Sequence, residues 1–117
     1  MNFSQEVSND ILIEIINLKR ATITESDEFK KILLKAIADG WRKVVIDFKY
    51  CSFMDSTFLG SLVLGLKEIA KVGGDLRIAE AHGDSQEIIE LTGTSRIFQT
   101  FKTREEAILS FNTKKTA

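Results

Sequence analysis

The sequence predicts an α/β fold, in which a mixed, mostly parallel sheet is flanked by helices. Short apolar or β-branched runs alternate along the chain with longer runs whose apolar residues recur every three or four positions. Such alternation is typical of parallel sheets, because parallel neighbouring strands need a crossover that is usually helical. The chain has no proline and no Gly/Ser-rich linker, so nothing marks a domain boundary.

Two strands and a helix are expected in the first forty residues. The β-branched run from Asp10 to Leu18 predicts a strand, and a shorter strand near Phe3 to Val7 should pair with it through the Ser8-Asn9-Asp10 turn. A helix capped by Thr24 or Ser26 should follow and end at the next glycine. Its apolar positions are Phe29, Ile32, Leu33, Ala36 and Ile37.

The middle of the chain contains the clearest strand and the clearest helix. Lys43 to Phe48 is a short apolar run typical of a buried central strand. A helix is expected from Ser56 to Val72, terminated by Gly73-Gly74. The apolar stripe of this helix consists of Leu59, Leu62, Val63, Leu66, Ile69 and Ala70.

Two further strands and two further helices complete the expected domain. Asp75 to Ala81 and Ile97 to Phe101 should be strands, with a short helix from Asp84 to Thr92 between them and a last helix starting at Thr103. The expected buried positions of these helices are Ile88, Ile89, Leu91, Ala107, Ile108 and Phe111. Residues 1–112 would then form one domain of four to five strands and about four helices, followed by a polar tail, residues 113–117.

Composition limits the classes of function. The 117 residues are enough for a single hydrophobic core, and 44% hydrophobic with 28% charged residues is typical of a globular domain. The net charge of -1 and the scattered basic residues argue against nucleic-acid binding. We expect a cytoplasmic location without membrane insertion, because the N-terminal residues contain no signal-type apolar run and no long apolar segment follows.

Catalytic, metal and cofactor sites are not expected. Cys51 is the only cysteine and should be a buried thiol, while His82 is the only histidine and should lie on a solvated loop. A hydrolase using Ser56 with Asp55 would lack a histidine base and the usual Gly-x-Ser-x-Gly turn. No cofactor is predicted, since no glycine-rich phosphate loop precedes a helix.

The segment Phe-Met-Asp-Ser-Thr-Phe-Leu-Gly, residues 53–60, is the strongest functional signal. Its hydroxyl groups lie between a strand and a helix, at the edge where α/β proteins place their sites. Asp55, Ser56 and Thr57 could simply cap the helix. The same unpaired backbone amides would also stabilise a phosphoryl group on Ser56 or Thr57. Because Asp55 would repel that phosphate, phosphorylation would change charge and partner fit more than it would tighten the domain.

The run from Asp47 to Ile78 resembles the signature of STAS domains, specifically the stand-alone anti-sigma factor antagonists of bacterial partner-switching systems. The matching residues are Phe53, Met54, Asp55, Ser56, Thr57, Leu59, Gly60, Gly73 and Gly74, and the resemblance extends from Ile11 to Phe111. It implies a sheet with helices mainly on one side and a role in binding rather than catalysis.

The resemblance also implies a phosphorylation switch at Ser56, with Thr57 as the less favoured acceptor. In the family, a GHKL-type serine kinase that is also the anti-sigma factor phosphorylates the serine that follows the aspartate. The unphosphorylated antagonist binds this kinase, the phosphorylated antagonist releases it, and a PP2C-type phosphatase removes the phosphate. The alternative is a constitutive STAS subunit of a transport or lipid-trafficking assembly, in which Ser56 is only a helix cap.

Two departures from the family pattern suggest where partner choice is determined. Phe58 occupies a position where the family usually has glycine, and we expect its ring on a binding surface rather than packed back on the domain.

The loop of residues 19–22 is basic where the family is often acidic. Arg20 therefore either pairs with a phosphate on Ser56 or, as we favour, remains a solvated side chain. The expected partner-binding residues are Asp55, Phe58, Ser61, Leu64, Arg20 and Thr22.

Overall fold

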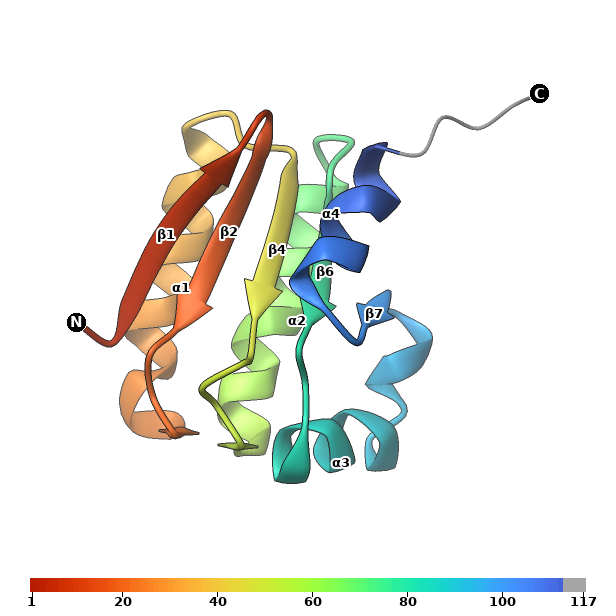
Figure 1. Cartoon of the computed structure of the whole chain (residues 1–117). Coiled ribbons are helices and arrows are strands. Elements are labelled where there is room, and N and C mark those ends of the chain that lie inside the picture. Colours follow the sequence, from red (N-terminus) through yellow and green to blue (C-terminus); the bar gives the residue numbers. More distant parts are fainter. Residues whose placement is uncertain (113–117) are drawn as a thin grey trace.

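The computed structural model describes residues 1–112 and contains a five-stranded sheet with helices packed against it (Figure 1). The strand order is β1-β2-β4-β6-β7. Strand β1 (Phe3–Ser8) pairs antiparallel with β2 (Ile11–Ile16), and the other neighbours in this sheet are parallel. The predicted mixed, mostly parallel sheet is confirmed. The predicted tail, residues 113–117, lies outside the described residues.

The predicted helices are all present, with shifts of a few residues at their ends. They are α1 (Ile23–Ala38), α2 (Ser56–Ala70), α3 (Gly83–Leu91) and α4 (Arg104–Asn112). The remaining strands of the large sheet are β4 (Lys43–Asp47), β6 (Asp75–Ala79) and β7 (Thr100–Phe101). The expected buried thiol of Cys51 and the exposed position of His82, just before α3, are also confirmed.

The strand predicted from Ile97 to Phe101 is reduced to its last two residues. A 3-10 turn, Thr94–Arg96, occupies the chain before it, and Gly93 enters this turn with a left-handed backbone φ of 74°. The Thr94 hydroxyl donates a hydrogen bond to the Ile89 carbonyl, which fastens the turn to the end of α3. These local hydrogen bonds compete with strand pairing. The β-branched and aromatic residues of the predicted strand were therefore not enough to extend it beyond two residues.

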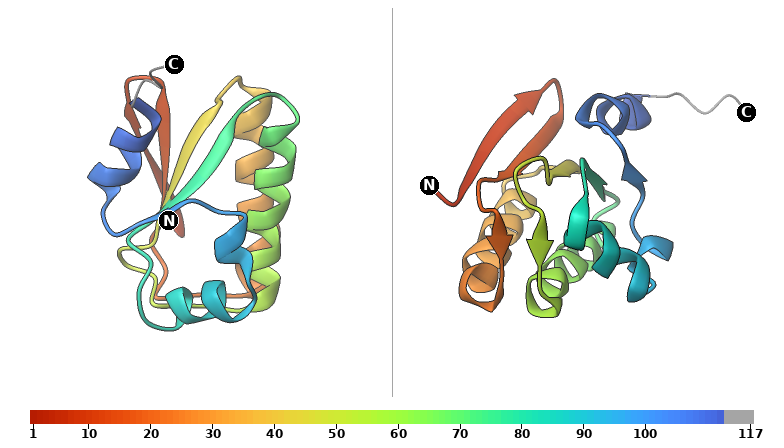
Figure 2. Two further views of the ribbon diagram at one scale, coloured as in Figure 1. Left: turned by 90° about the vertical axis from the view of Figure 1, so that its right-hand side faces the viewer. Right: turned by 60° about the horizontal axis from the view of Figure 1, so that its bottom comes forward.

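Helices α1 and α2 lie side by side on one face of the sheet (Figure 2). Gly65 lets the two helices approach closely, because a Cβ atom there would collide with the Leu33 side chain. The strands and these helices bury one apolar cluster between them, which includes Leu12, Ile16, Phe29, Leu33, Val44, Ile46, Phe58, Leu62, Ile69, Leu76 and Ile78.

The helices lie mainly on one side of the sheet, as expected, because α1, α2 and α3 all contribute to the apolar cluster on that face. Among the described helices, only α4 covers the opposite face (Figure 2, left). The reason is visible in β2, where all six residues are buried and both faces therefore need a cover. Ala107 packs into the apolar cluster on this face, and Ile108 and Phe111 lie against it, as predicted. In α3, by contrast, the prediction of a buried Leu91 is wrong, since this side chain is 77% exposed.

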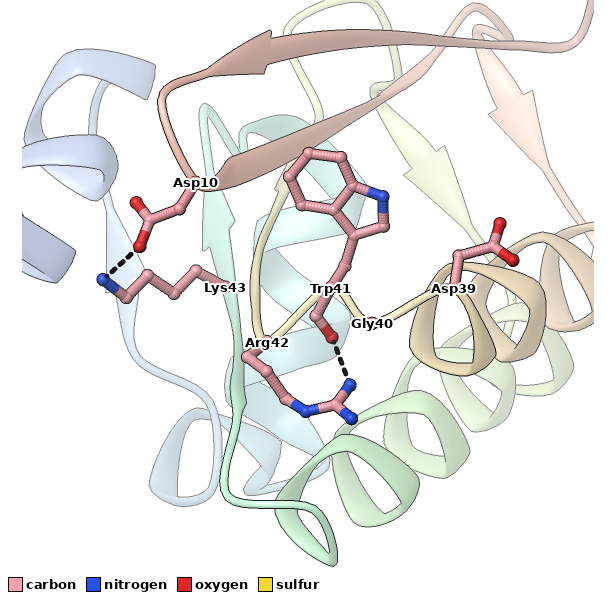
Figure 3. Close-up of a pocket in the computed structure, with 6 residues that line it drawn as sticks. All are labelled: Asp10, Asp39, Gly40, Trp41, Arg42 and Lys43. Carbon is pink, nitrogen blue, oxygen red and sulfur yellow. Dashed lines mark hydrogen bonds and ion pairs between the residues drawn. The ribbon is translucent and has the colours of Figure 1, made fainter.

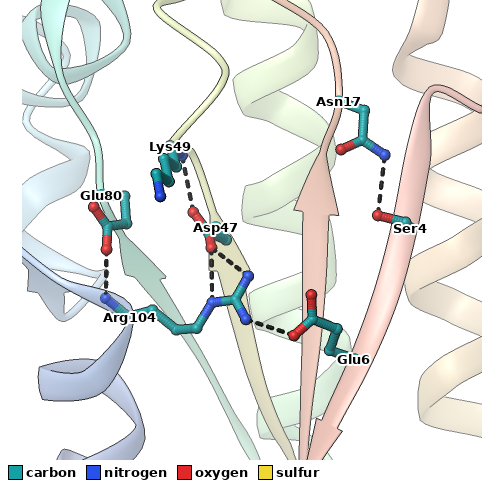
Figure 4. Close-up of polar contacts among 7 residues, drawn as sticks. All are labelled: Ser4, Glu6, Asn17, Asp47, Lys49, Glu80 and Arg104. Carbon is teal, nitrogen blue, oxygen red and sulfur yellow. Dashed lines mark hydrogen bonds and ion pairs between the residues drawn. The ribbon is translucent and has the colours of Figure 1, made fainter.

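A polar network fastens the start of α4 to the sheet (Figure 4). The Arg104 guanidinium contacts the Asp47 carboxylate at 2.9 and 2.8 Å and donates to Glu6 at 2.7 Å. The backbone N–H of Arg104 donates to the Glu80 carboxylate at 2.8 Å. One arginine therefore joins three strands, β1, β4 and the end of β6, to the last helix.

Candidate functional site

Two very short strands lie beside the segment that contains Ser56. β3 (Arg20–Ala21) and β5 (Phe53–Met54) pair in parallel, below the carboxyl ends of the long strands. The backbone N–H of Asp55 donates to the Ala21 carbonyl at 3.2 Å. This pairing brings the start of α1 next to the start of α2. Sequence reasoning missed both strands, because two residues are too few to show a period.

Asp55 caps both helix starts with one carboxylate. Its Oδ1 accepts a hydrogen bond from the Phe58 backbone N–H at 2.9 Å, and its Oδ2 accepts one from the Ile23 backbone N–H, also at 2.9 Å. The first bond caps α2, and the second satisfies an unpaired donor in the first turn of α1. Asp55 thus fixes the position of the Ser56 segment relative to the loop of residues 19–22.

Ser56 and Thr57 are the first two residues of α2, and both are exposed. Asp55, rather than either hydroxyl, is the side chain that caps the helix. In the described part of the chain, the Ser56 and Thr57 hydroxyls make no hydrogen bond to another protein group. The Ser56 Oγ is therefore an exposed hydroxyl at the positive end of a helix.

Thr22 and Arg20 lie on the loop that runs beside this segment. Thr22 caps α1 by accepting from the Thr24 backbone N–H at 3.2 Å, and Glu25 accepts from the Thr22 backbone N–H at 2.9 Å. The predicted cap at Thr24 or Ser26 is therefore wrong, because this capping box starts the helix earlier. Arg20 is exposed, and its guanidinium carbon lies 3.9 Å from the centre of the Phe53 ring.

Phe58 does not lie on the surface, so that expectation is wrong. Its side chain is fully buried, and its ring lies 5.0 Å from the ring of Phe29 and 6.3 Å from that of Phe3. Ser61 is also buried and donates to the Ser26 carbonyl at 3.1 Å, while Leu64 is half-buried. This side of α2 faces α1, so the expected exposed patch of Phe58, Ser61 and Leu64 does not form.

An open groove of about 330 Å³ lies next to Ser56 instead. One wall is formed by residues 53–56 and the other by α3, through Asp84, Glu87, Ile88 and Leu91. These four α3 residues are spaced three or four positions apart, so they share one face of the helix. The same spacing in the sequence indicates that Leu91 lies on the face that carries Asp84 and Glu87, which the prediction of a buried Leu91 does not take into account. The groove combines apolar side chains with carboxylates on both walls, since Asp55 also lines it. It is acidic and lies beside the free hydroxyl.

A second pocket, of about 430 Å³, lies near the amino ends of β2 and β4 (Figure 3). Its charged side chains are engaged within the protein: Lys43 pairs with Asp10 at 2.8 Å, and Arg42 donates to the Trp41 carbonyl at 3.0 Å. Ligands of α/β sheets bind outside the carboxyl ends of the strands, which is the edge where Ser56 lies. The groove beside Ser56 is therefore the stronger candidate site.

The described residues hold no obvious metal or membrane feature. Within residues 1–112, no three side chains of the metal-binding types gather closely enough to hold an ion. In the same range, no helix is both long enough and apolar enough to span a bilayer. The chemistry of the site is that of an exposed hydroxyl, a capping carboxylate and an acidic, partly apolar groove.

Comparison with known proteins assigns this arrangement to a family. Residues 11–107 match the STAS domain. The chain is 27% identical over 88 residues to BtrV of Bordetella bronchiseptica, a candidate anti-sigma factor antagonist, covering 75% of this chain and 76% of that protein.

Solved structures show the same fold. The crystal structure of a candidate anti-sigma factor antagonist, TM1081 of Thermotoga maritima, superimposes with a TM-score of 0.89 at 25% identity and 95% coverage of both chains. The phosphorylated form of the Bacillus protein SpoIIAA has a TM-score of 0.73 at 20% identity, with coverages of 93% and 98%. The family resemblance stated from the sequence is confirmed: the chain belongs to the STAS domain family, and its relatives include stand-alone anti-sigma factor antagonists.

Proposed function

We propose that this protein is a cytoplasmic partner-switching regulator of the anti-sigma factor antagonist type, which acts by binding and not by catalysis. In its unphosphorylated form it binds a GHKL-type serine kinase that is also an anti-sigma factor. Phosphorylation of Ser56 releases this partner, and a PP2C-type phosphatase restores the binding form. The relatives named as anti-sigma factor antagonists support the general role.

The proposal rests on the observation that Asp55, and not Ser56, caps the start of α2. If Ser56 were only a helix cap, its hydroxyl would accept from a backbone N–H of the first turn of α2. Asp55 makes that bond instead, at 2.9 Å from the Phe58 nitrogen. The exposed Ser56 hydroxyl makes no hydrogen bond to another group among the described residues, and it is accessible to a kinase.

The surroundings of Ser56 explain how a phosphate would act as a switch. A phosphoserine brings about two negative charges at neutral pH. Asp55, Asp84 and Glu87 already make the adjacent groove acidic, so the added charge would increase the negative potential that a bound partner meets. Partner release would then follow from a change in surface charge, with little change in the fold.

Mass spectrometry and binding measurements together test this proposal. The peptide from Phe53 to Lys67, isolated from cells that express the native protein, should carry phosphate on Ser56. The phosphate should be lost in Ser56→Ala and kept in Thr57→Ala, which is the matched control. The absence of phosphate in the native peptide would instead favour a constitutive STAS subunit of a transport or lipid-trafficking assembly.

The binding arm uses a purified GHKL-type serine kinase of the same organism. Ser56→Ala should bind this kinase as tightly as the native protein does. Ser56→Asp should bind at least about tenfold more weakly, because it places a charge at the interface. Equal affinity of Ser56→Asp and native protein would disprove the switch.

A further inference from the structure

A second groove lies on the α1 side of the sheet, between β1 and α1. Its main part has a volume of about 450 Å³ and is lined by Met1, Phe3, Ser4, Gln5, Glu14 and Ile32. A smaller part of about 120 Å³ adjoins it, since both parts share Gln5 and Ile32. The groove is open because α1 packs closely against only the first part of β1. Phe3 contacts Phe29 at 4.7 Å, whereas Gln5 is exposed.

Glu14 forms the polar floor of this groove. It lies in the middle of β2 between Leu12 and Ile16 on the same face, and its side chain is fully buried. The Oε2 atom accepts a hydrogen bond from the Gln5 side-chain amide at 2.8 Å. The other carboxyl oxygen, Oε1, has no hydrogen-bond partner among the described residues.

A half-satisfied buried carboxyl group is unfavourable for the fold. A buried polar atom without a partner destabilises the native state, and it does so more strongly when it is charged. An apolar residue at position 14 would avoid this penalty and extend the cluster of Leu12 and Ile16. The acid is therefore better explained by a ligand than by packing.

We propose that this groove binds a small organic amine, with its ammonium group at Glu14 and its apolar body against Phe3 and Ile32. An ionised carboxylate only accepts hydrogen bonds, and an ammonium group supplies both the donors and the opposite charge. The volume lies within the usual range for sites that bind small molecules. Gln5, which is exposed, covers the carboxyl group and would have to move aside for the ammonium group.

Several charged side chains near the groove already have partners. Lys35 and Asp39 of α1 line its smaller part and bind each other at 3.0 Å. Farther along α1, Glu28 accepts from the Asn2 side chain at 3.0 Å. On the neighbouring strand β4, Lys43 pairs with Asp10. Among the described residues, Glu14 is the one whose side chain has a buried oxygen without a hydrogen-bond partner.

The protonation of Glu14 gives the site a predictable pH dependence. Burial raises the pKa of Glu14 to about 7, and the hydrogen bond from Gln5 only partly opposes this rise. The ammonium group binds the ionised form, which is about a tenth of the protein at pH 6 and about nine tenths at pH 8. The affinity should therefore fall about tenfold from pH 8 to pH 6.

Cyclohexylamine is the probe, and cyclohexanol is its neutral counterpart of the same shape. Each is titrated into the whole chain at pH 8 and followed by amide chemical shifts in NMR spectra. The amine should shift resonances of β1, β2 and α1, and the alcohol should bind at least about tenfold more weakly. Glu14→Gln should reduce the affinity for the amine at least about tenfold, whereas Glu28→Gln, which removes an acid from the exposed side of α1, should leave it unchanged.

Three results would overturn the proposal. They are equal binding of the amine and the alcohol, an undiminished affinity in Glu14→Gln, and the absence of specific shifts at about 10 mM amine, where even a weak site is occupied. The wild-type comparison of pH 8 with pH 6 needs no variant, and an affinity that does not fall at pH 6 would also count against it. The site is separate from Ser56, so these results do not depend on the partner-switching function.

Discussion

The rings of Phe58 and Phe29 stack with their centroids 5.0 Å apart, which joins the first turn of α2 to the middle of α1. Phe3 of β1 lies on the same aromatic cluster, 4.7 Å from Phe29. The exposed Ser56 is thus only two residues from one of the most deeply buried side chains of the domain. The candidate phosphoacceptor is held on a rigid part of the structure.

Replacing Phe58 by alanine should therefore destabilise the fold strongly. Removal of a fully buried phenylalanine ring lowers the free energy of unfolding by about 3 to 5 kcal/mol. Urea denaturation followed by circular dichroism measures this change. Thr57→Ala, at the exposed neighbouring position, should stay within about 0.5 kcal/mol of the native protein. A loss below about 1 kcal/mol for Phe58→Ala would mean that the ring is not buried in solution.

The error over Phe58 shows where sequence reasoning reached its limit. The fold class and the order of the predicted elements follow from local periodicity and are confirmed. The predicted stripe of α2 is buried or half-buried except at Ala70, which is exposed. The spacing of the apolar residues predicts a stripe that starts at Leu59 and does not include Phe58. Its burial depends on α1, which packs against that side of α2 from a distant part of the sequence.

The geometry around Ser56 was predictable only in part for the same reason. Position, residue type and family resemblance identified the segment that starts α2 and the loop of residues 19–22 beside it. The second hydrogen bond of Asp55 joins it to Ile23, 32 residues away, and no local pattern encodes such a contact. The α3 wall of the groove likewise becomes visible only when the chain is folded.

Asp55→Ala should test the double cap. The substitution removes both hydrogen bonds, to Phe58 and Ile23, and should lower the free energy of unfolding by about 2 kcal/mol, at the upper end of the usual range for a lost cap. Asp55→Asn should lie in between, because its single amide oxygen replaces only one of the two acceptors well. Chemical denaturation gives both values.

Glu87→Ala, which removes an exposed acid from the same groove, is the control, and it should change the free energy of unfolding very little. If Asp55→Ala were as neutral as this control, the double cap would not contribute to stability.

Glu14 should make the stability of the protein depend on pH. Because burial raises its pKa in the folded state to about 7, above the ordinary value near 4.5, the folded protein binds this proton more tightly than the unfolded chain does. The stabilisation is complete below about pH 4.5 and is lost as the pH rises through about 7. Glu14→Gln cannot ionise, so its stability relative to the native protein should increase by about 2 to 3 kcal/mol between pH 5 and pH 8. Urea denaturation across this range measures the difference, and a difference that stays constant with pH would contradict the assignment.

Arg104 should be important for the stability of the α4 face, because it neutralises a carboxylate that is only 1% exposed, that of Asp47. Arg104→Met would leave this charge buried, with the Lys49 backbone N–H as its remaining hydrogen-bond donor among the described residues, at 2.8 Å. Removing one partner of a buried ion pair typically lowers the free energy of unfolding by about 3 to 5 kcal/mol. Glu6→Gln, which breaks only the more exposed contact of the same arginine, should lower it by less than about 1 kcal/mol.

The double variant Arg104→Met with Asp47→Asn separates the charge effect from the loss of packing. Once Asp47 is neutral, no uncompensated charge stays buried, so the double variant should be more stable than Arg104→Met alone. Thermal and urea denaturation of the four proteins of this cycle give the coupling energy between the two side chains. A double variant less stable than Arg104→Met would show that the unpaired charge of Asp47 is not the main cost of losing Arg104.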